Sequence, residues 1–425
     1  MGILLSLSNM FLLNLRIGFF LAVRQIRRAN KWTTGLIVFV MILTFLNLVV
    51  VSGILVGLIE GSIAAYHAQY TGDVIISRLD NKKYIEGSPN IINILKDIPD
   101  IKSFSPRFST GVIAEANYQT KKETDKANTA SAQLVGINPL AEDTLTGLGE
   151  HILEGSYLTP NDYDKVLVGY FLLKQYVTID SPDFSALKNV YVGTKIRLNI
   201  NGTMREVTVK GILKSKVDNV RRGIFMIDSQ AKELMGRDDN NVSEIAINLK
   251  PGVDPIAFKQ KLVLAGINNS AKVQTYADAQ PQFLKDIVNT FRTLGNFLSS
   301  IGLVVSSITI FIVIFINALT RRKFIGILKG IGINGQAIEI SYVFQSIFYA
   351  LLGSMIGLLA VYLLLVPFFK AHPINFPFSD GILVAPLGET LIRMALLIIS
   401  TIIAGYVPSR MIVQKNTLDS ILGRN

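Results

Sequence analysis

Four long apolar stretches divide the chain, and a block of more than two hundred mostly polar residues separates the first from the second. Residues 33–59, 293–320 and 340–369 carry no charged side chain, and residues 386–408 carry one acid and one base. Crossing a hydrocarbon core about 30 Å thick takes roughly 20 helical residues, so each stretch is long enough. Backbone groups in lipid must be paired within their own segment, which predicts helices.

Basic residues outside these stretches indicate which ends face the cytoplasm. They cluster before the first stretch, between the second and third, and after the fourth; they are Arg16, Arg24, Arg27, Arg28, Lys31, Arg321, Arg322, Lys323, Lys329, Arg410, Lys415 and Arg424. The positive-inside rule puts all three clusters on the cytoplasmic side, and four crossings satisfy them together. The polar block and the loop 370–386 are therefore expected outside.

The sequence thus predicts an α-helical membrane protein with four transmembrane helices (1+3) and a large α+β extracytoplasmic domain between helices 1 and 2. The polar block is long enough to hold its own core, and we expect two lobes. The expected parts are a cytoplasmic or interfacial helix 1–31, helix 32–60, the extracytoplasmic domain 61–290, helix 291–320, a cytoplasmic segment 321–336, helix 337–369, the loop 370–386, helix 387–409 and a cytoplasmic tail 410–425.

The first residues allow two interpretations. The segment 3–20 is apolar, but Asn9, Asn14 and Arg16 interrupt it and several cations follow. We favour an amphipathic helix lying along the inner membrane surface over a short additional span.

The distribution of charge argues against nucleic acid as a partner. The net charge is +11, yet residues 60–286 contain 27 basic and 27 acidic side chains. The excess therefore belongs to the membrane-flanking parts, where it orients the helices and attracts lipid headgroups. The chain has no cysteine, so disulfide and thiol chemistry are excluded.

Alternating strands and helices are predicted in the polar block. Asn201-Gly202 lies between two apolar-alternating segments and supplies the positive φ angles of a tight type I′ hairpin. Ser88 is expected to cap a helix with Pro89 in its first turn. Residues 282–297 are expected to be helical and to run into the second span, either to carry force or as a simple stalk. The strands are expected at 73–77, 108–118, 130–137, 195–200, 204–212 and 244–249, and a helix at 254–264.

Patterns typical of enzymes give no catalytic site. His67, His151 and His372 are scattered, without partners at metal-ligand spacing, so no metal site is expected. No Walker loop occurs. The segment 330–335 has the form G-x-G-x-x-G, but it lies between helical segments, so we expect a turn, with Asn334 as a helix cap, and no bound cofactor.

Glycines at helical spacing mark one face of two spans. They are Gly53, Gly57 and Gly61 in the first span and Gly353 and Gly357 in the third. Small residues at this spacing allow close helix packing in lipid, either within the chain or at a subunit seam. Glu389 and Arg393 are expected to pair across one helical turn.

The segment 321–332, RRKFIGILKGIG, resembles the R-x-R-E-I-G-I-L-K-A-L-G-A sequence after the second span in permeases of the MacB/LolC/FtsX class of ABC transporters. Further similar segments follow in the family's order: 22–28, 134–139, 166–169, 192–196, 209–213, 405–410 and 416–422. Phe324 stands where the family usually has an acid, and Asn416 replaces a frequent acid, so an ion pair from position 324 is not expected.

The resemblance implies that residues 321–331 form a coupling helix seated in a cleft of a separate ATPase subunit. The implied apolar insert is Ile325, Ile327, Leu328 and Ile331, and the implied charged surround is Arg321, Arg322, Lys323 and Lys329, with Phe324, Gly326 and Gly330 in the same segment. The alternative is that these cations only mark the end of the second span.

The family's function implies a permease subunit without catalysis of its own. Two such subunits, identical or related, would each work with an ATPase that uses ATP and Mg²⁺, in a bacterial inner membrane. An adaptor protein and an outer-membrane component are further partners that the resemblance leaves open. Mechanotransmission would drive efflux of a compound or extraction of a lipoprotein or lipid. The alternative is signalling to a periplasmic cell-wall hydrolase; an ion channel or proton-coupled carrier is weakly supported, since the spans hold no acidic or histidine relay.

Overall fold

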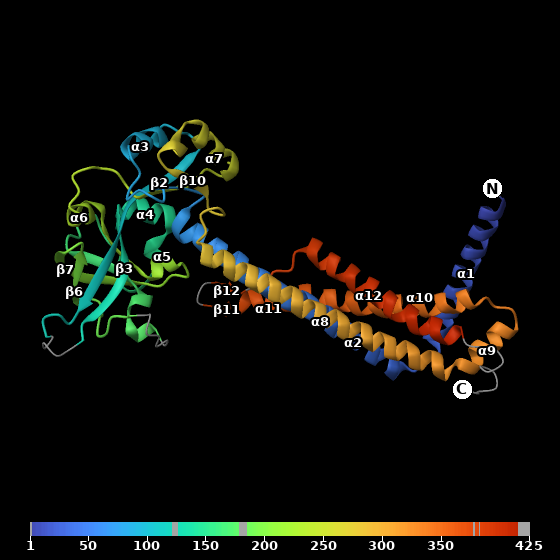
Figure 1. The fold of residues 1–425 in the computed structure, drawn as a ribbon. Helices are drawn as coiled ribbons and strands as arrows, with labels where there is room; N and C mark the ends of the chain where they lie inside the picture. Colours follow the sequence, from blue (N-terminus) through green and yellow to red (C-terminus); the bar gives the residue numbers. More distant parts are fainter. Residues whose placement is uncertain (1, 121–125, 178–184, 377–378, 382, 415–425) are drawn as a thin grey trace. The chain divides into compact units, whose positions relative to one another are not determined.

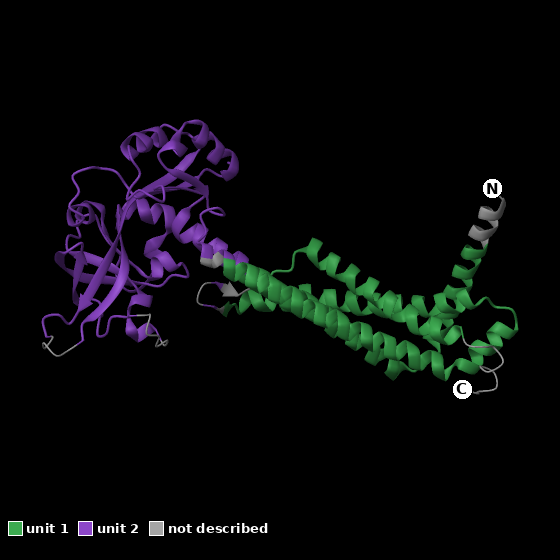
Figure 2. Cartoon of the chain, in the orientation of Figure 1, with its two compact units in different colours: residues 1–58, 286–375, 380–425 green, residues 59–285, 376–379 purple. Residues whose placement is uncertain are grey.

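The computed structural model describes residues 2–120, 126–177, 185–376, 379–381 and 383–414. Within them the chain forms two compact units, described separately here (Figure 2). We call residues 1–58, 286–375 and 380–425 the helical unit, and residues 59–285 with 376–379 the sheet unit. The resemblance segment 416–422 and the cations Lys415 and Arg424 lie outside the described residues.

Four helices in the described residues are long and apolar enough to cross a membrane, as the sequence predicts. They span Lys31–Thr71, Lys285–Thr320, Gly335–Ala371 and Leu387–Val413. The helices are α1 (Gly2–Arg27), α2 (Lys31–Tyr66, continued by a π turn His67–Thr71), α8 (Gln282–Thr320), α9 (Arg322–Gly330), α10 (Gly335–Ala360, continued by a π turn Val361–Leu365), α11 (Val366–Ala371) and α12 (Leu387–Val413). The short strands β11 (Ile374–Asn375) and β12 (Asp380–Gly381) pair between α11 and α12.

The helical unit is built around α10, which packs against both α1 and α12 (Figure 1). α1 is helical, as both interpretations of the first residues require. It is tied to α10 by an Asn14 to Gln336 hydrogen bond of 3.2 Å and an edge-to-face contact of Phe19 with Phe344. A buried apolar cluster from α2, α8, α10 and α12 holds the unit together.

The sheet unit contains a mixed sheet of ten strands among the described residues. The strands are β1 (Val74–Ser77), β2 (Ile101–Ala116), β3 (Asn128–Ile137), β4 (Ile152–Gly155), β5 (Lys165–Gly169), β6 (Lys195–Ile200), β7 (Thr203–Leu213), β8 (Gly223–Ile227), β9 (Glu244–Leu249) and β10 (Lys272–Thr275). The order is β10-β1-β9-β2-β3-β8-β5-β7-β4, and β6 pairs with both β2 and β7. The pairs β3–β8 and β5–β7 are parallel.

Because β6 joins β7 back to β2, six strands close a ring, β2-β3-β8-β5-β7-β6. Alternate side chains of these strands fill its interior with a buried core, for example Leu134, Val168 and Val209. Closure pairs these six strands on both sides, whereas β10 and β4 lie at the two ends of the sheet.

A second core lies on the other half of the sheet, where α3 (Ser88–Lys96) and α7 (Pro255–Leu264) contribute to one buried cluster with β1, β9 and β10 (Figure 1). β2 passes through both halves, so one strand links the two cores. The remaining helices are α4 (Pro139–Thr146), α5 (Asp218–Arg221) and α6 (Asp228–Leu234), with 3-10 turns at Leu148–His151, Tyr170–Leu172, Lys174–Tyr176 and Ile267–Asn269.

Several local predictions are confirmed. β6 and β9 have the expected bounds, and Asn201 and Gly202 adopt φ angles of 51° and 92° in the hairpin. One cap is wrong: Gly87, at φ 67°, is the N-cap of α3, and Ser88 is its first residue. The Ser88 hydroxyl instead accepts a hydrogen bond from the Val242 amide, because Ser88 is buried against that loop. The strand expected at 108–118 begins earlier, at Ile101, and ends at Ala116.

Candidate functional site

The segment between α8 and α10 forms the nine-residue helix α9. Gly332 takes a φ of 93°, a conformation that favours glycine, and turns the chain after α9. Asn334 then caps α10, its side chain accepting a hydrogen bond from the Gln336 amide at 3.1 Å, as the sequence predicts. The G-x-G-x-x-G pattern thus joins two helices, which is not the strand-to-helix setting of a dinucleotide site.

One face of α9 packs inside the helical unit. Ile325 is 3% exposed and belongs to the buried cluster, and Leu328 packs against that cluster. Ile325 is thus buried in the chain's own core, and Leu328 is partly buried against it; that these two side chains insert into a partner stays a prediction. Their spacing of three residues places them on the same helical face.

The face of α9 turned away from Ile325, together with the C-cap residue Ile331, exposes large apolar side chains. Phe324 is 69% exposed, Ile327 50% and Ile331 71%, and the cation Lys323 is exposed beside them. Residues 324, 327 and 331 share one face because they are separated by three and four positions. Exposed apolar side chains grouped in this way mark an interaction surface. We call Lys323, Phe324, Ile327 and Ile331 the α9 surface.

The basic residues of this segment are divided between the two faces. Arg322 is buried, and Lys329 donates a hydrogen bond of 2.9 Å to the carbonyl of Val413 at the end of α12. A cation at a helix C-terminus is favoured by the unpaired carbonyls and the helix dipole. The predicted charged surround is thus incomplete, since Arg322 and Lys329 stabilise the helical unit and Lys323 remains exposed.

The glycines of the spans lie at close contacts within the chain. A Cβ built on Gly353 would lie 2.4 Å from Met41 Cβ, and one built on Gly357 would lie 2.5 Å from the Phe45 ring. Gly53 likewise would meet Leu383 and Val384 at 2.7 Å. Helices and a loop of the same chain occupy the space at these three positions, which supports packing within the chain, and the subunit seam stays a prediction.

Other glycines extend this packing. Gly302 lies against Asn47 of α2, and Gly405 of α12 lies against Ser346 of α10. Gly57 is buried and Gly61 is partly buried.

Glu389 and Arg393 form the expected ion pair at 3.0 Å, and Arg393 also donates to Ser52 Oγ at 2.6 Å.

The sheet unit contains a buried ionic cluster that the sequence pattern did not indicate. Arg107 of β2 is 1% exposed and binds Glu142 of α4 through two nitrogens, Nε at 2.9 Å and Nη2 at 2.7 Å. Arg107 Nη2 also donates to the Tyr70 carbonyl at 2.7 Å, and the Tyr70 hydroxyl donates to Glu244 at 2.7 Å. The cluster thereby joins the π turn after α2 to β2, α4 and β9.

Electrostatics hold this cluster in its charged form. Burial by itself lowers the pKa of the Arg107 guanidinium, but the adjacent Glu142 carboxylate outweighs burial and raises that pKa above its ordinary value. A charged pair at this depth is a structural junction with no substrate-facing surface.

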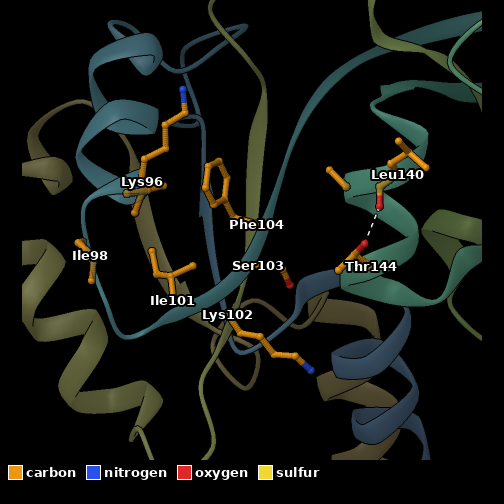
Figure 3. Close-up of a pocket in the computed structure, with 10 residues that line it drawn as sticks. Lys96, Ile98, Ile101, Lys102, Ser103, Phe104, Leu140 and Thr144 are labelled. Carbon is orange, nitrogen blue, oxygen red and sulfur yellow. Dashed lines mark hydrogen bonds between the residues drawn. The ribbon is translucent and has the colours of Figure 1, made fainter.

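A pocket in the sheet unit opens beside the start of β2 (Figure 3). Its volume is about 490 Å³, and its walls come from α3, β2 and α4. Figure 3 shows Lys96 and Lys102 extending in different directions, with Phe104 and Ser103 between them. Ser103 Oγ is buried without a hydrogen-bond partner in the described residues, and the β2–β9 register shifts between Ile101 and Ser103. This pocket can admit a molecule with apolar and polar parts.

The described residues contain no group of His, Cys, Asp and Glu side chains that could hold a metal ion. His67 instead pairs with Asp73 at 2.9 Å, and its ring lies 4.5 Å from that of Tyr276 in a tilted arrangement. Burial alone would raise the pKa of Asp73, but hydrogen bonds from His67 and the Leu249 amide lower it. The described residues thus offer two candidate binding surfaces, the α9 surface and the pocket beside the start of β2.

Comparisons with known proteins agree with this arrangement. The family model of the MacB-like periplasmic core domain matches residues 34–264, and that of the FtsX-like permease C-terminal region matches residues 296–417. An uncharacterized ABC transporter permease protein of Mycobacterium tuberculosis is 26% identical over 196 residues, 45% of this chain and 22% of that protein. The chain thus spans about a fifth of the length of this curated relative.

Two solved structures are similar to about half of the chain. The periplasmic region of MacB from Actinobacillus actinomycetemcomitans has 17% identity and a TM-score of 0.35, covering 50% of this chain and 92% of that one. The extracellular domain of YknZ, a noncanonic ABC-type transporter from Gram-positive bacteria, has 17% identity and a TM-score of 0.31, covering 48% and 98%. Scores this low do not by themselves establish a shared fold.

Proposed function

Because the chain belongs to the family of ABC transporter permeases that combine a MacB-like periplasmic core domain with an FtsX-like C-terminal region, we propose that it couples a separate ATPase to movements of its sheet unit. Membership in this family implies a partner subunit that is an ATPase. The cargo would be an efflux substrate, a lipoprotein or a lipid. Signalling to a periplasmic hydrolase is the alternative outcome.

The α9 surface is the observation that carries the proposal. Phe324, Ile327 and Ile331 are exposed although large apolar side chains are normally covered, and α9 lies directly between α8 and α10. An ATPase cleft that received this face would bury three apolar side chains without disturbing Ile325 or Leu328, which already pack inside. Phe324 stands where the family usually has an acid, so this contact would be apolar.

The proposed topology is one span before and three after the sheet unit, in a bacterial inner membrane. The basic residues at the start of α2, in α9 and at the end of α12 support it, because the positive-inside rule assigns all of them to the cytoplasm. α1 would lie along the inner membrane surface, since its contacts to α10 involve residues near the start of that helix, such as Gln336 and Phe344.

Topology can be tested with single cysteines, because the natural chain has none. Lys83→Cys in the sheet unit and Lys323→Cys in α9 should react with an impermeant maleimide from opposite faces of sealed vesicles. Labelling of both positions from the same face would overturn the proposed topology.

The coupling surface is tested with Ile327→Glu in the tagged full chain, purified from its native membrane. We expect the co-purified ATPase activity to fall at least about tenfold, because a carboxylate would enter an apolar contact. Leu264→Glu is the matched control, since Leu264 is 88% exposed at the end of α7 in the sheet unit. Equal ATPase recovery in both variants would contradict the assignment of α9.

A further inference from the structure

An open apolar groove lies in the helical unit near the junction of α1 and α2. Its volume is about 610 Å³. Residues of α1 and α2 form most of its wall, and Leu352 of α10 completes it. The lining residues are Ile26, Arg27, Ala29, Lys31, Thr34, Gly35, Val38, Phe39, Ile42 and Leu352.

The two ends of the groove differ in charge. Arg27 is the last residue of α1 and Lys31 the first of α2, whereas Val38, Phe39 and Ile42 lie further along α2. At 1.5 Å per residue, the distance from position 31 to position 42 along the helix is about 16 Å. This is about half of a hydrocarbon core of roughly 30 Å, which is the depth of one leaflet. No acidic residue lines the groove.

A smaller polar chamber adjoins the basic end and shares Ala29 and Thr34 with the groove. Its volume is about 170 Å³. Tyr342 lines it and is 1% exposed, and its hydroxyl has no hydrogen-bond partner in the described residues. The other polar side chains around it are Gln25, Asn30, Thr33, Asn317, Thr320, Arg321, Gln345 and Tyr349. A buried hydroxyl without a partner is unfavourable, so a ligand oxygen in the chamber would satisfy it.

We propose that this groove binds an anionic phospholipid, with an acyl chain along α2 and the phosphate beside Arg27 and Lys31. The inference rests on the proposed membrane placement of α2. Polar headgroup atoms would reach the chamber that holds Arg321 and the Tyr342 hydroxyl. The apolar wall suits an acyl chain, and two cations without an acid suit a phosphate.

A second copy of the chain fits this groove less well. A twofold symmetric contact brings the same patch of both subunits together, so Arg27 and Lys31 would face their own copies near the axis. Like charges in a low-dielectric contact repel one another, and no acid in the groove offsets them.

Two residues near the groove allow binding to be measured and blocked: Trp32, through its fluorescence, and Gly35, through substitution by a larger side chain. Trp32 is the single tryptophan of the chain and is 87% exposed. It shares a helical face with Gly35 and Phe39, which line the groove. A Cβ on Gly35 would meet no atom within 4 Å, so a side chain can start there and Gly35→Leu would extend into the groove.

The test measures quenching of Trp32 fluorescence in vesicles that contain the full chain. Brominated phosphatidylglycerol is compared with brominated phosphatidylcholine at equal mole fractions. We expect half-maximal quenching at a mole fraction on the order of tenfold lower for the anionic lipid, given two nearby cations. Arg27→Gln with Lys31→Gln should remove this difference.

Two glycine variants separate a groove from general lipid contact. Gly35→Leu should weaken quenching by the anionic lipid severalfold. Gly388→Leu in α12 is the matched control, because its Cβ also would meet nothing within 4 Å, and it should leave quenching unchanged. Equal quenching by the two brominated lipids in the natural chain would overturn the proposal.

Other outcomes overturn it in distinguishable ways. If a second copy covers the groove, neither lipid quenches Trp32 and Phe39→Cys forms an intermolecular disulfide. If α2 lies outside the bilayer, neither lipid quenches, no disulfide forms and alkaline carbonate extracts the chain from membranes. The last result would contradict the proposed function itself, whereas the others concern the lipid site alone.

Discussion

Replacing Glu142 by glutamine should open the sheet unit locally. The substitution keeps the shape of the side chain but removes the carboxylate that binds Arg107 through two nitrogens at 2.9 and 2.7 Å. Arg107 is 1% exposed and Glu142 2%, so water cannot replace the lost partner. The nearest remaining carboxylate, Glu244, lies 3.8 Å from Arg107 Nη1.

The magnitude follows from leaving a buried cation without its main partner. Removing one member of a buried ion pair typically costs about 3–5 kcal/mol. Each 1.4 kcal/mol is a factor of ten, so the population of the opened state should rise on the order of 100-fold or more. Asp100→Asn is the control, because its pair with Lys261 is largely exposed, at 54% for Lys261 and 36% for Asp100.

Hydrogen exchange of the full chain, read by mass spectrometry, measures this opening. Peptides from β2, α4 and β9 should exchange faster in Glu142→Gln than in the natural chain. In Asp100→Asn the same peptides should keep the protection that they have in the natural chain. A double variant with Arg107→Met and Glu142→Leu should recover part of the protection, because apolar side chains of similar volume replace the pair. Unchanged protection in Glu142→Gln would refute the structural role of the cluster.

Other substitutions test the packing of each unit. Gly353→Leu should destabilise the helical unit, since its Cβ would lie 2.4 Å from Met41, while Gly388→Leu should have little effect; melting temperatures in detergent that fall equally would contradict this packing. Burial would raise the pKa of Asp162, but hydrogen bonds from Lys165, Lys210 and Thr159 lower it below its ordinary value. A pKa that is lowered in the folded state stabilises the fold at pH values above the unfolded pKa of about 4. Asp162→Asn should therefore lose its full share of stability at pH 7, and this loss should shrink as the pH falls below about 4. A difference in melting temperature between Asp162→Asn and the natural chain that does not change with pH would be evidence against these hydrogen bonds. Gly202→Val should weaken the hairpin by on the order of 1–3 kcal/mol, because φ is 92° there, and faster exchange confined to β6 and β7 would show it.

Local chemistry made much of the fold predictable from the sequence. Asn201-Gly202 specified its hairpin because few other residue pairs adopt two positive φ angles. Asn334 capped α10 because an amide oxygen can accept from the exposed amides of a helix start. The four long apolar helices were predictable because the length of an apolar stretch alone decides whether it can cross a membrane.

Features that depend on distant parts of the chain were not predictable. Arg107, Glu142 and Glu244 are far apart in sequence, and only the pairing of β2 with β9 and the position of α4 bring them together. The closed ring of strands likewise follows from β6 pairing with β2, for which no local pattern exists.

The sequence predicted a helix at the candidate site, but it did not predict which face of that helix is exposed. Apolar residues recur at helical spacing on more than one face of α9. The sequence alone therefore could not decide which face packs against the chain's own core. The structure assigns Ile325 and Leu328 to that core and leaves Phe324, Ile327 and Ile331 exposed. The glycines of the long apolar helices are a similar case. Their spacing predicts a close contact, but it does not show which segment makes that contact.

Site-specific photo-cross-linking tests the central claim most directly. A benzophenone amino acid at position 324 would place the reactive group on the α9 surface, and the same group at position 264 serves as the control. The account predicts a light-dependent adduct between position 324 and a polypeptide with a Walker loop, which mass spectrometry would identify, and none from position 264. An ATPase adduct from position 264 with none from position 324 would contradict it.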